Sequence, residues 1–157
     1  MSLIAYTDGS SLGNPGPGGY GLILIETELK IKREISQGYR LTTNNRMELL
    51  AVIVALETLK KPKSFITIYT DSKYVVDSVE KKWVFGWVKK NFKDKKNEDL
   101  WRRFLKVYAL HNVQFTWVKG HAGNIWNERA DELAVQASNN QKDFLIDHYF
   151  EANQTKE

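Results

Sequence analysis

The phrase Tyr-Thr-Asp occurs twice in this chain of 157 residues, each time directly after an apolar or β-branched run. Residues 3–7 lead to Asp8, and residues 65–70 lead to Asp71. Short runs of this kind are typical of buried strands, so each predicted strand ends in an aspartate. If the two strands are parallel neighbours, both carboxylates lie at one edge of a sheet, where they repel each other unless a cation lies between them. The alternative is that each aspartate caps a turn or a helix, as Asp-Gly and Asp-Ser often do.

The remaining pattern predicts an α/β protein with a five-stranded mixed sheet, in which a three-stranded antiparallel meander and two parallel strands are flanked by helices. We expect one domain over residues 1–157. The glycine-rich stretch 9–19 is interpreted as turns because it has too few side chains for a strand. For residues 139–157 the pattern leaves open whether the chain packs on the domain or stays mobile. The expected strands are 3–7, 20–26, 31–39, 65–70 and 113–118, and the expected helices are 47–56, 73–81, 99–110 and 126–137, the first of them preceded by possible N-cap residues at 42–45.

The helix predicted over residues 47–56 has apolar residues on more than one side, which indicates that it is largely buried. Glu48 is then an acid near the start of a buried helix. Such burial is costly unless something cationic meets the carboxylate. A capping box that uses Glu48 is the competing interpretation.

Composition narrows the kind of partner and of metal site. The chain contains no cysteine, which excludes disulfides and thiolate zinc sites. Its net charge is +4 and its pI about 9.2, and residues 81–96 hold seven lysines against one acid, Asp94, among several aromatic residues. This local basic segment is typical of a surface that binds nucleic-acid phosphates. The first residues resemble neither a signal peptide nor a membrane anchor, so we expect a cytoplasmic monomer without membrane contacts.

Five motifs follow one another in order along the chain, at residues 7–10, 14–21, 42–49, 70–72 and 117–123 with 127–134. Together they resemble bacterial type-one ribonuclease H. The resemblance implies the ribonuclease H-like fold and a metal-dependent endonuclease that hydrolyses the RNA strand of RNA–DNA hybrids, leaving 5′-phosphate and 3′-hydroxyl ends.

By this resemblance, four carboxylates bind two metal ions. An all-oxygen ligand set suits Mg²⁺, with Mn²⁺ as a substitute. In the family's arrangement one aspartate bridges the ions, the last acid holds the ion that activates water, and the other two hold the ion near the leaving oxygen. A histidine would move protons or assist product departure, and an asparagine would orient the attacking water or the last acid. Taken alone, that last acid would be interpreted as a partner of the helix dipole. The residues are Asp8 as the bridge, Glu48 and Asp71 near the leaving oxygen, Asp131 as the last acid, His121 and Asn127.

The resemblance also implies contacts with each strand of the hybrid. The RNA strand would be read at its 2′-hydroxyls through the wide minor groove, by Gly9, Ser10, Ser11, Asn14, Asn44, Asn45 and, where relatives often carry glutamine, Lys73. A phosphate pocket for the DNA strand would be formed by Thr43 and Asn97, with Leu41 where a basic residue is expected and Arg40 beside it. A basic protrusion over about 81–97, shorter than in well-known bacterial members, would grip the DNA strand through Trp83, Trp87, Lys89, Lys90, Phe92, Lys93, Lys95 and Lys96.

The predicted nucleic-acid contacts also have alternative interpretations in which the residues have only a structural role. The asparagines at 44 and 45 would cap the helix, and the aromatic residues of the protrusion would pack in the core beneath solvated lysines. A catalytically silent binding module of the same fold would have lost a carboxylate, and all four are present. Related nucleases that cut DNA usually lack the asparagine pair and the protrusion. Both features therefore favour hybrids as the substrate.

Overall fold

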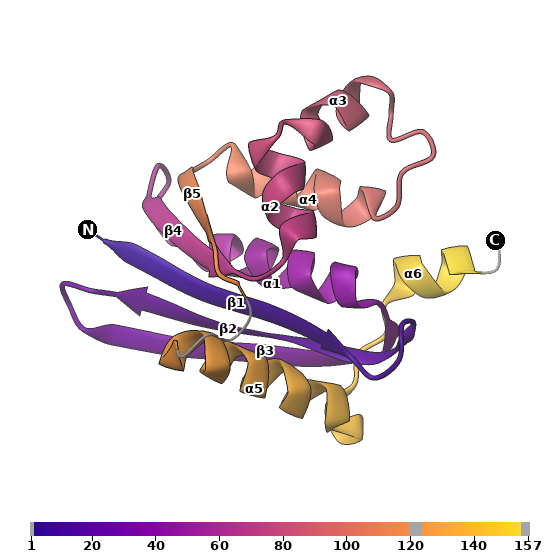
Figure 1. Ribbon diagram of the computed structural model, residues 1–157, viewed down its shortest axis with the longest axis horizontal. Coiled ribbons are helices and arrows are strands. Elements are labelled where there is room, and N and C mark those ends of the chain that lie inside the picture. Colours follow the sequence, from indigo (N-terminus) through magenta and orange to yellow (C-terminus); the bar gives the residue numbers. More distant parts are fainter. Residues whose placement is uncertain (1, 120–123, 155–157) are drawn as a thin grey trace.

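The computed structural model describes residues 2–119 and 124–154 and contains one five-stranded sheet in the order β3-β2-β1-β4-β5 (Figure 1). The first three strands are antiparallel neighbours, whereas β1 and β4, and β4 and β5, are parallel. The predicted mixed sheet is therefore confirmed. The strands are β1 (Leu3–Ser11), β2 (Gly16–Glu26), β3 (Ile31–Thr42), β4 (Phe65–Thr70) and β5 (Asn112–Trp117).

The register of the two central strands places the repeated aspartates together. Tyr6 of β1 pairs with Tyr69 of β4, and the rings of this pair stack with centroids 4.8 Å apart. Asp8 and Asp71 each follow two residues later. The interpretation of two parallel neighbours with both carboxylates at one edge is confirmed.

The prediction of turns over residues 9–19 is wrong except for residues 12–15. β1 continues to Ser11 and β2 begins at Gly16, so that Ser11 pairs with Gly18 across the ladder. At two of the glycines the reason is a helix packed on the strand: a Cβ on Gly19 would lie 2.8 Å from the Ala137 Cβ, and a Cβ on Gly9 would lie 2.3 Å from the Glu48 backbone nitrogen. These contacts join residues far apart in the sequence, so local propensity does not register them.

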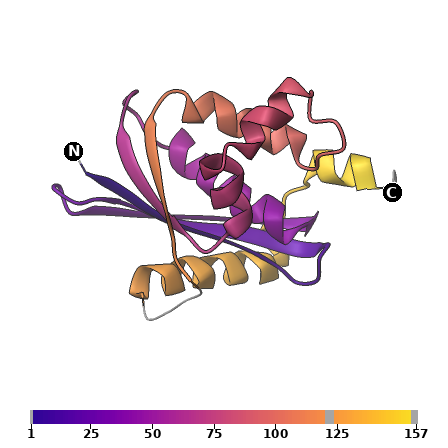
Figure 2. The ribbon, with the colours of Figure 1, turned by 45° about the horizontal axis from the view of Figure 1, so that its top comes forward.

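Helices cover both faces of the sheet (Figure 2). One face carries α1, with α2 and α4 against it, and the other carries α5, which lies across β1, β2 and β3. No helix among residues 2–119 and 124–154 is long and apolar enough to cross a membrane. The helices are α1 (Asn44–Glu57), α2 (Lys73–Glu80), α3 (Trp83–Lys89), α4 (Glu98–Tyr108), α5 (Ile125–Asn139), the short 3₁₀ turn η1 (Gln141–Asp143) and α6 (His148–Asn153).

Helix α1 is buried on nearly all sides, as its apolar pattern predicts. Ten of its residues are buried, including the charged Arg46 and Glu48, which are 2% and 6% exposed. The main core packs between this helix, the sheet and the aromatic residues Trp101 and Phe104 of α4. α1 is thus a rigid base for any side chain at its start.

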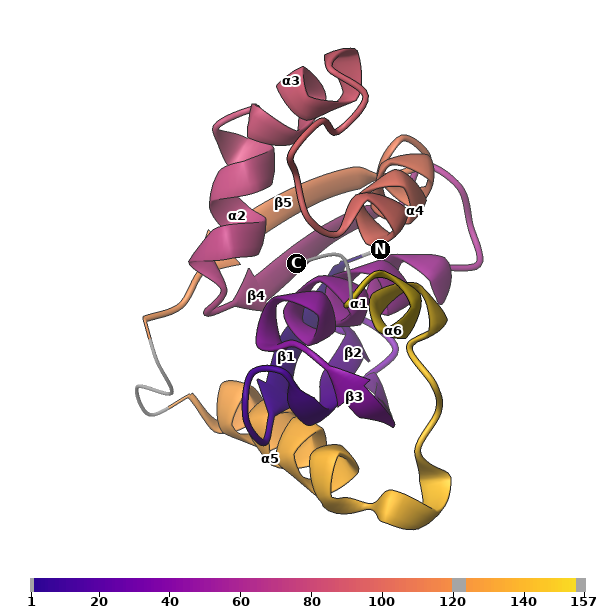
Figure 3. The same ribbon diagram turned by 90° about the vertical axis from the view of Figure 1, so that its right-hand side faces the viewer.

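The C-terminal segment, for which the sequence left two possibilities, packs back on the domain through residue 154. After α5 the chain runs around the edge of the sheet, and α6 comes to lie near the start of α1 (Figure 3). Leu145 forms a parallel bridge with Tyr39 of β3, through Leu145 N–H to Gly38 O at 3.0 Å and Arg40 N–H to Leu145 O at 3.0 Å.

Candidate active site

Three acidic side chains converge where β1, β4 and α1 meet. Asp8, Glu48 and Asp71 each offer an oxygen atom within 4.8 Å of the other two. Asp8 and Glu48 are buried and Asp71 is half-buried. Such proximity of like charges in a poorly solvated place is unfavourable without protons or cations.

A glycine permits the close approach of the helix. A Cβ on Gly9 would lie only 2.3 Å from the backbone nitrogen of Glu48. Any larger residue at position 9 would push α1 away from β1. The glycine after Asp8 thus has a packing reason, and its N–H also donates to Asp8 Oδ1 at 2.8 Å.

The capping alternatives for Glu48 and Asp71 are wrong. The N-cap of α1 is Thr43, whose hydroxyl accepts from Arg46 N–H, so Glu48 lies beyond the capping-box position. The N-cap of α2 is Ser72, which accepts from Val75 N–H at 3.2 Å, not Asp71. Capping does not account for either carboxylate.

Burial and the neighbouring carboxylates raise the affinity of Asp8 and Glu48 for protons. Burial, followed by the charges of Asp71 and Asp131, raises the pKa of Asp8 to about 8, against the lowering effect of the Gly9 N–H. Burial, followed by the charges of Asp8 and Asp71, holds the pKa of Glu48 well above its usual range. The site therefore favours any added positive charge, whether proton or metal ion.

Asp131 reaches the cluster from the opposite face of the sheet. It lies on α5, and its side chain is near enough to hydrogen-bond with Asp8 and raise the pKa of that group. The four predicted ligands thus come from β1, α1, the end of β4 and α5. Interaction with the helix dipole alone does not explain why Asp131 lies next to Asp8.

The donor set fits a hard divalent cation. Among the described residues, the buried Glu48 Oε2 has no hydrogen-bond partner, while Oε1 accepts from Asn44 Nδ2 at 3.5 Å. A buried carboxylate oxygen without a partner is costly, and coordination of a cation would satisfy it. Oxygen-only ligands suit Mg²⁺ or Mn²⁺.

The two other predicted catalytic residues are Asn127 and His121. Asn127 lies on α5, is 9% exposed, and its Nδ2 has no hydrogen-bond partner within residues 2–119 and 124–154. This buried amide has donors available for a bound molecule. His121 lies outside the described residues.

The RNA-strand candidates gather around the first loop and the start of α1. Asn14 Oδ1 accepts from Asn44 N–H at 3.1 Å, which joins the loop to the helix. Because Thr43 caps α1, the alternative that Asn44 and Asn45 act as caps is wrong. Ser10 and Ser11 are half-buried, and Gly9 is buried.

The exposed Lys73 lies over the ring of Trp117, with its Nζ 4.7 Å from the centroid. Trp117 in turn donates its indole N–H to the backbone oxygen of Asp71 at 3.1 Å. Sequence reasoning did not single out Trp117. Its position at the end of the last predicted strand, next to the sheet edge that holds the carboxylates, could have indicated its role.

The basic protrusion separates into exposed and buried members. Trp83 is 47% exposed, whereas Trp87 is half-buried with its ring edge-on to Trp101 at 5.9 Å. Phe92 is only 3% exposed, so the prediction that Phe92 contacts nucleic acid is wrong; its ring belongs to the core beneath Arg102. The lysines remain on the surface, and those predicted to touch phosphate, Lys89, Lys90, Lys93, Lys95 and Lys96, are all exposed.

Thr43 and Asn97, the predicted phosphate pocket, line one hollow of about 470 Å³. Asn97 Oδ1 accepts from Arg46 Nη1 at 3.3 Å, and Asn97 Nδ2 donates to the Tyr74 hydroxyl at 3.0 Å. Arg40, beside Leu41, instead forms a bidentate pair with Glu151.

A buried network of ion pairs lies beneath this hollow, and the sequence analysis did not predict it. Arg46 donates to Asp147 at 2.7 and 3.0 Å and to Asp99 at 2.8 and 2.7 Å. The available signal was an arginine inside a buried helix with no acid one turn away on either side. That pattern requires acidic partners from elsewhere in the chain.

A family model for RNase H matches residues 1–139. The chain belongs to the ribonuclease H family. The match ends before η1 and α6, so the folded-back C-terminal segment lies outside it.

Curated ribonucleases H from bacteria are close to this chain in sequence. The protein from Trichodesmium erythraeum is 56% identical over 141 residues, which cover 87% of this chain and 88% of the relative. That from Desulforamulus reducens is 53% identical over 141 residues, covering 87% of each.

Solved structures agree with the fold. LC9-RNase H1, described as a type 1 RNase H with the type 2 active-site motif, superposes with a TM-score of 0.79 at 34% identity, covering 89% of this chain and 73% of that one. LC11-RNase H1 in complex with an RNA/DNA hybrid gives a TM-score of 0.65 at 26% identity, covering 89% and 99%.

Proposed function

We propose that this ribonuclease H hydrolyses the RNA strand of RNA–DNA hybrids, leaving 5′-phosphate and 3′-hydroxyl ends, with two Mg²⁺ ions held by Asp8, Glu48, Asp71 and Asp131. The observation that carries the proposal is the buried cluster of Asp8, Glu48 and Asp71 within 4.8 Å. Membership of the family and the hybrid complex of LC11-RNase H1 support the substrate.

The metal ions, when bound, would stabilise the charge that develops on the attacking and leaving oxygens of a phosphodiester. The chain supplies the geometry. Asp8 and Glu48 lie on elements that are rigid because they are buried, so the ligands need little reorganisation when the ions bind. Asn127 offers a buried Nδ2 with no partner among the described residues, in a place to orient a water molecule beside Asp131. His121 would take up or release a proton, because histidine side chains as a class titrate near neutral pH.

Hybrid recognition divides between two surfaces. Asn14, Asn44 and Asn45, with Ser10 and Ser11, would contact 2′-hydroxyls of the RNA strand near the carboxylates, by contacts that do not depend on base sequence. Lys73, fixed on Trp117, would add a positive charge beside them. The exposed lysines of the protrusion, together with Trp83, would hold the DNA strand by neutralising phosphates.

The test uses one labelled RNA strand, presented as RNA–DNA hybrid, as duplex RNA and as single strand, with Mg²⁺, with Mn²⁺ and with chelator. We expect cleavage in the hybrid only and with metal only. Asp8→Asn should abolish cleavage and leave binding of the hybrid largely intact, whereas Asp77→Asn serves as the control, because Asp77 is a half-buried acid of α2 that pairs with Lys81. An active Asp8→Asn enzyme would contradict the two-metal assignment, and binding without cleavage by the wild type would favour a silent binding module. The monomeric state and the cytoplasmic location remain predictions.

A further inference from the structure

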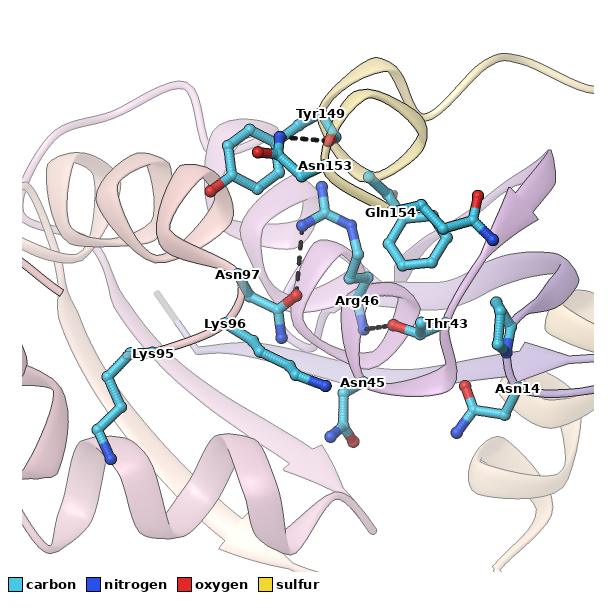
Figure 4. Close-up of a pocket in the computed structure, with 12 residues that line it drawn as sticks. Asn14, Thr43, Asn45, Arg46, Lys95, Lys96, Asn97, Tyr149, Asn153 and Gln154 are labelled. Atoms are coloured by element: carbon cyan, nitrogen blue, oxygen red, sulfur yellow. Dashed lines mark hydrogen bonds between the residues drawn. The ribbon is translucent and has the colours of Figure 1, made fainter. Parts of the chain in front are cut away.

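The hollow that contains Thr43 and Asn97 has a wall built by the segment outside the family match. Figure 4 shows Tyr149 and Asn153 of α6 and the following Gln154 on one side, Thr43 and Asn45 at the start of α1 on the other, and Asn97, Lys96 and Lys95 along the remaining side. Asn14, Pro15, Arg46 and Phe150 complete the lining.

Helix α6 is held in place by a single buried carboxylate. Asp147, 8% exposed, caps the helix by accepting from Phe150 N–H at 3.3 Å. The same side chain accepts from Thr42 Oγ1 at 2.7 Å and from Arg46 Nε at 2.7 Å. The tail is thereby tied both to the last residue of β3 and to the first turn of α1.

Further contacts fix the rest of the helix. Tyr149 lies under the Arg46 guanidinium, 5.3 Å from its ring centroid, and Glu151 pairs with Arg40 at 2.9 and 2.8 Å. The last residues of the described segment are therefore presented at a defined place. A contact from a positioned helix loses less conformational entropy on binding than one from a loose tail.

The chemistry of the lining suits a phosphodiester backbone. None of the twelve lining residues carries a carboxylate. Arg46 is matched by Asp99 and Asp147 within the protein, so the lining offers Lys95, Lys96 and a set of amides. Lysine ammonium groups together with amide N–H donors favour an anion, and a cation would find no charged ligand here.

We propose that α6 extends the DNA-binding surface of this enzyme, with Gln154 and Asn153 contacting a backbone phosphate of the DNA strand beside the one assigned to Thr43 and Asn97. This inference rests on the proposed function for the identity of the ligand. Asn153 already donates one side-chain N–H to the backbone oxygen of Tyr149 at 2.7 Å, and this hydrogen bond orients the Asn153 amide. The exposed Gln154 lies at the open end of α6. The family match ends at residue 139, so the contact would be an addition to the part of the chain that the family model covers.

The test measures binding of a labelled RNA–DNA hybrid by fluorescence anisotropy in chelator, so that no cleavage occurs. Gln154→Glu places a negative charge at the proposed contact, and Gln141→Glu makes the same change on η1, outside the hollow. We expect Gln154→Glu to weaken binding by about 3- to 10-fold, and Gln141→Glu to change it by less than about 2-fold. Thermal unfolding of both variants monitors folding.

A set of hybrids with a single neutral methylphosphonate, moved along the DNA strand, then locates the contact. We expect one linkage at which the neutral group weakens wild-type binding but not that of Gln154→Glu. The same replacement in the RNA strand should affect both proteins equally. Equal effects of Gln154→Glu and Gln141→Glu at every linkage would overturn the proposal and leave α6 as a structural element only. Because the readout is binding, an enzyme that binds but does not cut would refute the proposed function without touching this inference.

Discussion

Replacing Asp8 by asparagine is expected to stabilise the metal-free protein even though it removes a residue of the site. In the wild type, Asp8 is 5% exposed and surrounded by other carboxylates, and its pKa is raised from the ordinary 3.8 to about 8. The folded state therefore binds a proton that the unfolded state has released between these two pH values. Stability of the wild type must fall as pH rises through this window.

The magnitude follows from the pKa. The interval between the ordinary pKa of 3.8 and pH 7 is about three pH units. At ~1.36 kcal/mol per unit, the raised pKa of Asp8 lowers the free energy of unfolding at pH 7 by at most about 4 kcal/mol. We expect about 2 kcal/mol, because neighbouring carboxylates also take up protons and share the cost. For a domain of this size that corresponds to roughly 4–8 °C in Tm. Asparagine keeps the acceptor for Gly9 N–H and adds a donor for the buried Glu48.

The assay is thermal unfolding by circular dichroism at pH 5, 6, 7 and 8 in chelator and again with excess Mg²⁺. The gap between Asp8→Asn and wild type should widen from pH 5 to pH 8 in chelator. Mg²⁺ should narrow it, because metal binding stabilises only the folded wild type. Asp77→Asn, which loses a partly exposed ion pair with Lys81, should change stability by less than ~1 kcal/mol at all four pH values. A gap that stays constant with pH, or an Asp8→Asn protein less stable than wild type at pH 8, would refute the electrostatic account.

Three further changes test packing and charge. Gly9→Ala should destabilise the protein by more than ~2 kcal/mol and reduce cleavage, because the new Cβ would meet the Glu48 backbone at 2.3 Å; an unchanged Tm would show that α1 can shift freely. Replacing Lys89, Lys90, Lys93 and Lys95 together by alanine should raise KM far more than it lowers kcat and should weaken the salt dependence of KM. An unchanged KM would show that these lysines are solvated and do not contact the substrate. Asp147→Asn should cost about 2–4 kcal/mol in denaturant unfolding because Arg46 loses one of its two carboxylate partners, whereas Asp143→Asn on the same segment should cost under ~1 kcal/mol; equal costs would contradict the role of the buried pair.

The carboxylate edge could be predicted from sequence because it depends on local signals. Two short apolar runs that each lead to an aspartate need only belong to parallel neighbouring strands, and the pairing of Tyr6 with Tyr69 shows that they do. Glu48 was recognisable because an acid in a helix with apolar residues on several sides requires a partner. Each inference used a rule that applies within a few residues of the side chain concerned.

The errors arose where distant contacts decide the outcome. Gly19 lies in a strand with α5 packed directly on its backbone, and no local pattern reports that contact. Phe92 is buried through contact with α4, although it sits among exposed lysines. Asp147 is separated from Arg46 by 101 residues, so their pairing depends on the completed fold.

The start of α1 joins the carboxylate cluster to the hollow that we propose binds the DNA strand. Thr43 and Asn45 line the hollow, Arg46 is held by Asp147 and Asp99 beneath it, and Glu48 belongs to the carboxylate cluster. Successive residues of a helix point about 100° apart, so this short stretch contributes to all three environments from one rigid backbone. A shift of α1 would therefore displace a proposed metal ligand and the proposed DNA-strand contacts together. The buried ion network fixes α1 against α4 and the C-terminal segment, and so holds the spacing between the carboxylates and the proposed phosphate contacts.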